Sequence, residues 1–299
     1  MKARSLALAL SVLSACGGGS ASTTTGAPAG SHAIRLSRTL AVGVTWGEVT
    51  HYASQQREVI SAGTTVVRDT ANSSVIEIAG DYSILALGAD GQPSRLRLAI
   101  DRATLDVGTG ASPLPVPAVI VITPGTPGTI AGENGEAIAE ETVEQLRHVL
   151  PDQAHPADDD AVFGTREPQR IGASWPIDPQ GTAHGLAALQ LTVDASNVGG
   201  STTLVSAGNE QNVDVLTLRT ELNASHIGFP GLPPGSVEQR ADVHATIEVV
   251  LPSDTAIVPL RETEQTNVDI QVLVPTEAGG TATVDVTIHE QVEHTRTPR

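Results

Sequence analysis

The pentapeptide GASWP, residues 172–176, is the stretch of this sequence that most nearly matches a catalytic motif. It begins like G-x-S-x-G, in which a sharp turn between a strand and a helix exposes a nucleophilic serine. The last glycine of that motif is Pro176 here, and no apolar pattern typical of a helix follows it. We therefore interpret Ser174 as a strand hydroxyl beside a core tryptophan, and we predict no catalytic residue in the chain.

Two other groups of side chains belong to types that bind metals. Residues 158–160 are three consecutive aspartates, but an EF-hand calcium loop needs acids at alternate positions and a glycine at its sixth, which is Phe163 here. We interpret the aspartates as a solvated acidic loop. His289 and His294 are five residues apart, so on a strand they face opposite sides of the sheet and would not share a metal. The sequence therefore predicts no metal site and no cofactor.

The only cysteine, Cys16, lies close to the start of the chain. It follows two basic residues, Lys2 and Arg4, and an apolar run over residues 6–13 that is too short to cross a bilayer as a stable helix. This arrangement is typical of a secretory signal. A single cysteine forms no internal disulfide, so the fold must depend on its apolar core.

The tetrapeptide LSAC, residues 13–16, resembles the lipobox of bacterial lipoproteins. The resemblance implies that residues 1–15 are a signal peptide and that Cys16 carries covalently attached lipid. Acyl chains of this kind would anchor the chain to a membrane of the bacterial cell envelope. Gly17 follows the cysteine, which by analogy with that family favours the outer membrane over the inner one. Residues 16–31 are rich in glycine, serine and threonine, and we interpret them as a lipidated, flexible tether.

The composition narrows the classes of partner. Seventeen Lys and Arg stand against 34 Asp and Glu, giving a formal net charge of −17, and such a chain repels the phosphates of nucleic acids. The sequence has two residues each of Trp, Tyr and Phe, too few for the stacking platforms of single-strand binders or the aromatic girdles of outer-membrane proteins. The apolar content is mainly aliphatic, which favours strands.

Apolar and polar residues alternate over much of the chain, the pattern of antiparallel strands with one wet face. Asp90-Gly91 lies between two such segments and is typical of a hairpin turn. We predict a mainly β fold, with curved antiparallel sheets in two similar halves. The alternating segments run from Ile34 to Trp46 (interrupted at Arg38), Leu96 to Ile100, Leu189 to Val193, Leu216 to Leu222, Val243 to Leu251 and Val284 to Ile288.

One segment has helical spacing instead. Residues 134–150 place apolar side chains near one helical face, with Asn134 as the cap and Pro151 as the stop. We predict one substantial helix there, between the two halves. The expected organisation is a signal peptide at 1–15, a tether at 16–31, a first β-rich half at 32–150 that ends in the helix, an acidic linker at 151–166 and a second β-rich half at 167–299.

The two tryptophans occupy similar sequence contexts. Residues 42–46, VGVTW, match residues 171–175, IGASW, in type at every position, which is consistent with an internal duplication without establishing one. Trp46 and Trp175 have two interpretations. Each could fill the core, its N–H bound to one partner, or the two could line a cavity for an apolar ligand.

Residues 167–177, EPQRIGASWPI, resemble the mid-chain motif of an uncharacterised group of bacterial secreted β-proteins, which implies a fold and not an activity. More loosely, a lipobox followed by antiparallel sheet and helix resembles the periplasmic lipoprotein and lipid carriers. We therefore expect a non-enzymatic envelope lipoprotein that binds or carries a lipid or other apolar ligand. The alternative is a structural or interaction lipoprotein that presents an acidic β surface to a protein partner.

Overall fold

The computed structural model describes residues 30–125, 128–151, 159–188, 191–229, 232–276 and 279–299. The signal segment, Cys16 and the tether up to residue 29 lie outside the described residues. No helix in these ranges is long and apolar enough to span a membrane.

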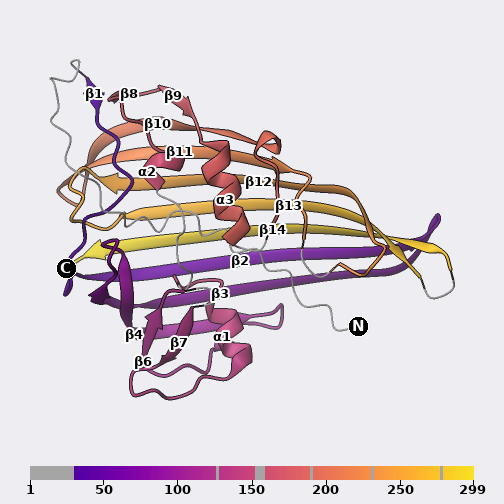
Figure 1. Cartoon of the computed structure of the whole chain (residues 1–299). Helices are drawn as coiled ribbons and strands as arrows, with labels where there is room; N and C mark the ends of the chain where they lie inside the picture. Colours follow the sequence, from indigo (N-terminus) through magenta and orange to yellow (C-terminus); the bar gives the residue numbers. More distant parts are fainter. Residues whose placement is uncertain (1–29, 126–127, 152–158, 189–190, 230–231, 277–278) are drawn as a thin grey trace.

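One large antiparallel sheet dominates the molecule (Figure 1). Its hydrogen-bonded order is β7-β6-β4-β3-β2-β14-β13-β12-β11-β10-β9, and β5 pairs with β4. The predicted mainly β, antiparallel class is confirmed. The strands are β2 (Thr45–Ala62), β3 (Thr65–Leu87), β4 (Pro93–Asp106), β5 (Ser112–Pro113), β6 (Val119–Thr123), β7 (Thr129–Gly132), β9 (Ser174–Pro176), β10 (Val198–Glu210), β11 (Val213–Ser225), β12 (Val237–Pro252), β13 (Arg261–Pro275) and β14 (Thr281–Pro298).

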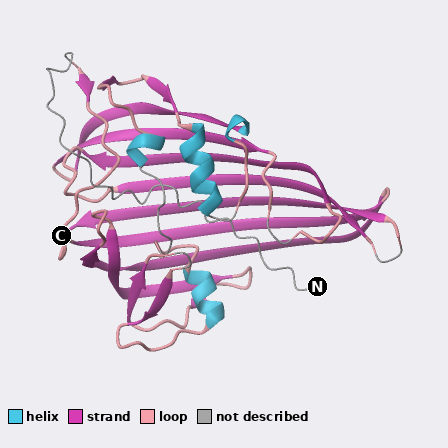
Figure 2. Ribbon diagram, in the orientation of Figure 1, coloured by secondary structure: helices cyan, strands magenta, loops and turns pink. Residues whose placement is uncertain are grey.

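Short elements lie against one face of this sheet, which we call the inner face (Figure 2). They are α1 (Glu140–Leu146), α2 (Asp159–Val162) and α3 (Pro179–Ala188). A 3₁₀ turn, η1 (Ala195–Asn197), precedes β10, and β1 (Ser31–His32) pairs with β8 (Gln169–Arg170) in a separate two-stranded sheet.

Two runs of neighbouring strands, β2 to β7 and β9 to β14, meet where β14 pairs with β2. That ladder extends from Pro298 opposite Trp46 to Thr283 opposite Ser61, so the two halves form a single sheet. The expectation that the halves are similar is not confirmed. Trp46 begins a long central strand, whereas Trp175 lies on a three-residue edge strand.

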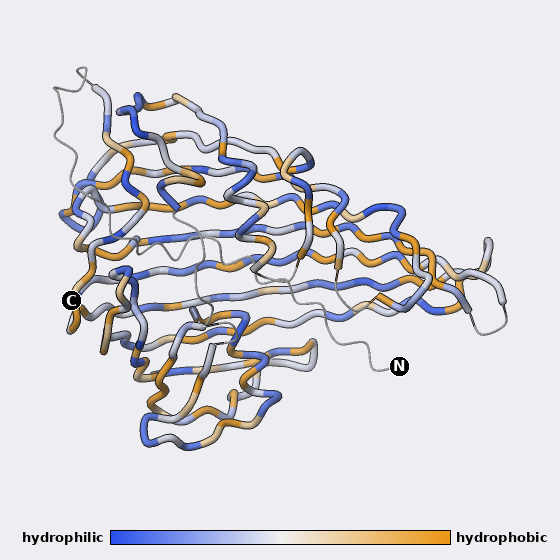
Figure 3. Tube along the Cα trace, in the orientation of Figure 1, coloured by the Kyte–Doolittle hydropathy of each residue, from blue (hydrophilic) through white to orange (hydrophobic). Residues whose placement is uncertain are grey.

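The alternation of side chains explains where the core lies. Hydrophobic and hydrophilic residues alternate along the long strands (Figure 3), and the apolar positions point to the inner face. They form two clusters. The C-terminal cluster packs Ile34, Phe163 and Leu186 against β10 to β13, and the N-terminal cluster packs Leu146 against β2, β3, β4 and β6. Burial of these aliphatic side chains is the main favourable term in folding.

The first predicted strand is wrong over most of its length. Residues 33–44 form no strand and lie outside the ladders, and the strand begins at Thr45. Arg38, which interrupts the alternation, is 1% exposed. Its guanidinium donates to the carbonyl oxygens of Pro252 (2.8 Å) and Leu36 (3.1 Å). This segment therefore satisfies backbone groups of a distant turn instead of pairing as a strand. The predicted strand at 189–193 is likewise reduced, within the described residues, to a single bridge between Thr192 and Gly228.

The predicted helix over 134–150 is shorter than expected. α1 covers Glu140–Leu146, because Gly135 adopts a φ of 78° in a turn that returns to Gly132. A longer helix, α3, was missed because its sequence, PQGTAHGLAA, has no apolar stripe. The sequence cue for this helix was Asp178 followed by proline, a cap residue before the first helical position. In the structure the Asp178 carboxylate accepts from the backbone N–H of Gly181 at 3.1 Å. A helix therefore does follow Ser174, although no apolar pattern in the sequence indicates it.

The acidic run is not a solvated loop where it is described. Asp159 and Asp160 begin α2, and Asp159 is buried. The Asp160 carboxylate accepts from the backbone N–H of Leu36 at 2.7 Å and of Ser37 at 3.4 Å. These bonds attach the N-terminal segment to residue 160, inside the predicted linker at 151–166. Asp158 lies outside the described residues.

The buried guanidinium of Arg38 gives a test of this attachment. Arg38→Met keeps the aliphatic bulk but leaves the carbonyls of Pro252 and Leu36 without their donor. We expect the free energy of unfolding, measured with urea, to fall by about 2–4 kcal/mol. Arg35→Met removes an exposed guanidinium three residues away and should change it by about 0.5 kcal/mol or less. Equal, small effects would show that Arg38 does not hold the segment.

Candidate functional site: a buried polar seam

A row of polar side chains separates the two apolar clusters on the inner face. We call it the polar seam. Its members come from the three adjacent strands β2, β14 and β13, at positions whose alternation points them inward. All are 8% exposed or less except His294, whose side chain is 13% exposed. They are Glu48, Thr50 and Tyr52 from β2, Glu290, His294 and Arg296 from β14, and Glu262, Glu264 and Thr266 from β13.

Strand register brings these residues together. Arg296 lies directly opposite Glu48, and His294 lies opposite Thr50 on one side and Glu262 on the other. Directly opposed side chains on a sheet have Cβ atoms about 4.5–5.5 Å apart, close enough for ion pairs and hydrogen bonds. The seam is therefore a product of the ladder that joins the two halves.

The first part of the seam is an ion-pair network around Arg296. Its Nε donates to Glu48 Oε2 at 3.0 Å, and its terminal nitrogen Nη1 lies 3.4 Å from Glu262 Oε2. Glu48 Oε1 lies 2.8 Å from His294 Nδ1, and Glu48 Oε2 accepts from the indole N–H of Trp46 at 2.7 Å. Both oxygens of Glu48 are thus satisfied, as a buried carboxylate requires.

Burial and charge oppose each other in this network. Burial by itself raises the pKa of Glu48, but Arg296, His294 and the Trp46 hydrogen bond together hold that pKa well below its usual range. Burial also raises the pKa of Glu262, and the attraction of Arg296 offsets only part of this effect. Burial lowers the pKa of Arg296, but Glu48 and Glu262 raise it by more than burial lowers it. The guanidinium therefore stays charged.

The second part of the seam holds protons on carboxyl groups. Glu290 accepts a hydrogen bond from the Tyr52 hydroxyl at 2.7 Å, and burial raises the pKa of Glu290 to about 7. Burial likewise raises the pKa of Glu264 well above its ordinary value, although Thr266 donates to that carboxylate at 3.0 Å. The ring of His148, just after α1, stacks on Tyr52 with ring centres 4.9 Å apart. The carboxyl groups at this end of the seam are therefore protonated, and so uncharged, at moderately low pH.

The three residues at the charged end of the seam are not arranged as a catalytic relay. Thr50 Oγ1 and Glu48 Oε1 both contact Nδ1 of His294, at 3.0 and 2.8 Å. A nucleophile–base–acid relay uses the two different nitrogens of the imidazole ring, so these three residues do not form one. Among the described residues, no group of three or more His, Cys, Asp or Glu side chains could hold a metal ion.

The residues predicted from sequence lie apart from the seam or at its border. Trp46 is in the N-terminal cluster, stacked on Tyr82 with ring centres 5.2 Å apart, and Trp175 is in the C-terminal cluster, where its indole donates to the Phe163 carbonyl at 2.8 Å. The structure does not bring the tryptophans together, because five strands separate β2 from β9. Ser174 is exposed on β9.

The histidine prediction is confirmed. His289 lies on the outer face and contacts Asn267, whereas His294 lies on the inner face and contacts Glu48. Sequence reasoning missed the seam itself, although a signal was present. Glu48 falls in phase with Trp46 and Tyr52, at a position where the alternation demands an apolar residue.

Comparisons with known proteins show no family for this chain. No family model matches it, and no curated protein does. Among solved structures, lipovitellin, described for its lipid–protein interactions, aligns with a TM-score of 0.34 and 8% identity over 84% of this chain and 25% of that one. An outer membrane channel from Pseudomonas putida F1 aligns with a TM-score of 0.19 and 10% identity over 87% of this chain and 97% of that one. This chain thus spans about a quarter of the lipovitellin chain, and neither likeness is close enough to indicate a function.

The ion-pair network predicts a large effect of removing its cation. Arg296→Met leaves Glu48 and Glu262 buried without their arginine, and we expect the free energy of unfolding to fall by about 3–5 kcal/mol. Arg299→Met removes a more exposed arginine that pairs with Asp81, and should cost about 0.5 kcal/mol. Adding Glu48→Gln and Glu262→Gln to Arg296→Met should restore part of the loss. No restoration would mean that the buried charges are not its cause. Chemical denaturation measures all three.

The raised pKa of Glu290 in the seam predicts that the free energy of unfolding depends on pH. Because the pKa of Glu290 is about 7 in the fold and 4.5 ordinarily, the folded state binds this proton more tightly. Its stabilising effect is complete below about pH 4.5 and is lost as the pH rises to about 7, by about 3 kcal/mol from this residue alone. Glu262 and Glu264 act in the same direction. Glu290→Gln should flatten the decline in unfolding free energy over this range, whereas Glu248→Gln, exposed on the outer face, should not. A decline unchanged by Glu290→Gln would contradict this assignment.

Proposed function

We propose that this chain is a lipid-anchored protein of the bacterial cell envelope that binds a lipid or other apolar ligand without catalysing a reaction. Cys16 would carry the anchor, and Gly17 favours the outer membrane. The ligand would lie on the inner face of the sheet, on the side that the short helices cover.

The observation that supports this proposal is an aliphatic patch at the margin of the C-terminal cluster, against which Val274 and Val286 pack. Four inward-pointing side chains, Ile60, Val274, Val284 and Val286, lie in the half of the sheet farthest from Trp46 and are only part-buried. We call them the distal patch. Val284 lies directly opposite Ile60 on β2 and directly opposite the buried Val272 on β13, so the patch continues the core.

Contiguous apolar surface of this kind favours a ligand that removes it from water. Each square ångström of apolar surface buried contributes about 25 cal/mol, so an acyl chain laid across three strands would gain several kcal/mol. The two helices nearest the sheet have 7 and 10 residues, short elements for a sheet of this width.

The proposal is tested with a chain that begins at Gly30, purified under native conditions. We expect mass spectrometry of its organic extract to find near-stoichiometric lipid. Val284→Glu places a charge on the distal patch and should reduce bound lipid about tenfold. Thr283→Glu is the matched control, since residue 283 is equally part-buried but faces outward, and it should bind as the unaltered chain does. Circular dichroism establishes that both variants are folded.

A clean extract from the unaltered chain, repeated after incubation with phospholipid vesicles, would contradict a carrier role. So would equal loss of lipid in the two variants. The second candidate function, presentation of an acidic sheet face to a protein partner, is favoured by the polar outward positions of β11 to β14. Cross-linking in cells that recovers no recurrent partner would exclude it.

A further inference from the structure

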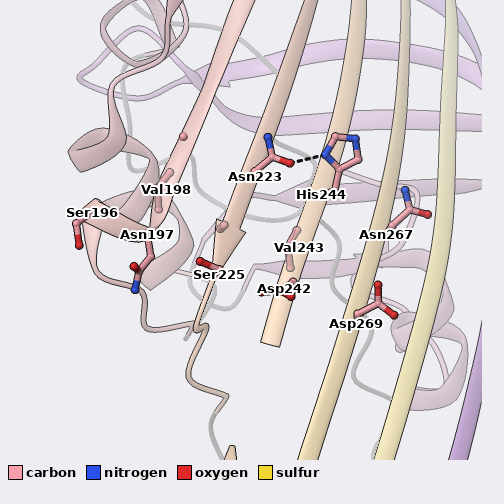
Figure 4. A pocket seen from close by; sticks show the side chains of 12 residues that line it. Ser196, Asn197, Val198, Asn223, Ser225, Asp242, Val243, His244, Asn267 and Asp269 are labelled. Carbon is pink, nitrogen blue, oxygen red and sulfur yellow. Dashed lines mark hydrogen bonds between the residues drawn. The ribbon is translucent and has the colours of Figure 1, made fainter. Parts of the chain in front are cut away.

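A groove lies on the outer face of the sheet, the face that does not carry the polar seam. It has a volume of about 470 Å³, within the range of small-ligand sites. Its floor is formed by outward-facing side chains of β11, β12 and β13, and residues 196–199 form one wall (Figure 4). That wall is fixed because the Asp194 carboxylate accepts from the backbone N–H of Ser196 at 2.8 Å.

The floor contains two carboxylates that face each other. Asp242 on β12 lies directly opposite Asp269 on β13, and both are part-buried. Like charges directly opposed on a sheet are destabilising. Within the described part of the chain neither carboxylate forms an ion pair, although Arg240 lies two residues from Asp242 on the same face. The Thr287 hydroxyl donates to Asp269 at 3.4 Å.

The neighbouring row of side chains adds an acceptor. Asn223, His244 and Asn267 are directly opposed across the three strands. His244 Nδ1 lies 2.6 Å from the amide oxygen of Asn223, and since that oxygen can only accept, Nδ1 carries the hydrogen. In the neutral ring Nε2 is then a hydrogen-bond acceptor. Figure 4 shows the His244–Asn223 hydrogen bond on the floor of the groove. The groove thus combines negative charge with acceptor atoms on adjacent strands.

We infer that this outer groove binds a primary ammonium or a guanidinium group between Asp242 and Asp269. Such a group offers several N–H donors and a positive charge, and charge-assisted hydrogen bonds are about twice as strong as neutral ones. The group could belong to a free polyamine or to a lysine or arginine side chain of another protein. The cation would also relieve the repulsion between the two carboxylates.

Titration calorimetry of the full chain in detergent, at low salt, tests this inference. One arm uses spermidine, and the other uses a short peptide with one lysine, acetyl-Gly-Lys-Gly-amide. Asp242→Asn and Asp269→Asn should each weaken binding about tenfold. Asp285→Asn is the matched control. It is part-buried on the outer face of β14, bonded to Gln271 at 2.7 Å, and lies outside the groove lining.

A stability readout separates binding from a structural role. Because each groove variant removes one of two opposed charges, its melting temperature should stay the same or rise. Tighter spermidine binding supports a free amine as the ligand, and tighter peptide binding supports a protein side chain. Equal weakening by all three variants would show diffuse attraction to an acidic protein and overturn the inference. Saturable binding of neither probe would also overturn it, without bearing on the inner-face ligand.

Discussion

The pairing of β14 with β2 is the constraint on which the rest of the molecule depends, and a buried arginine near one end of this ladder specifies its register. Arg296 contacts Glu48, 248 residues earlier, and Glu262 on the next strand. A one-residue slip of β14 would turn Arg296 outward and leave two buried carboxylates without a cation, which is costly in a low-dielectric interior. The interaction therefore sets the register in which two runs of strands become one sheet.

The same ladder divides the inner face into regions with different chemistry. At one end of the seam, charges are paired and Glu48 stays ionised. Farther along the same strands, Glu264 and Glu290 have no arginine in hydrogen-bonding contact within the described residues, and burial favours their protonated forms. Stability of the junction is therefore coupled to pH, in one sense through Glu48 and in the opposite sense through Glu264 and Glu290. Beyond the seam the inward positions of β13 and β14 become aliphatic again and lead to the distal patch.

The two faces of the sheet suit different ligands because strand residues alternate between them. Val284 on β14 points inward and lies directly opposite Ile60, whereas Asp285, the next residue, points outward to a polar surface. An apolar ligand and a cationic ligand would thus be recognised on opposite faces of one sheet without competing for the same side chains. Failure of either proposal leaves the other standing, since no side chain is shared.

The sequence by itself determined strands such as β12 and β14, because the alternation of apolar and polar residues along them indicates which side chains face water. It also determined that His289 and His294 face opposite sides. Only the tertiary structure decided which strands pair, since a ladder between residues 46 and 298 has no local signal. It decided that Arg38 is buried against distant carbonyls, and that Asp160 binds the backbone of Leu36. The polar seam follows the same rule. Its residues are polar side chains at positions where the alternation predicts apolar ones. Their partners lie on other strands, so these contacts form only when the sheet is complete.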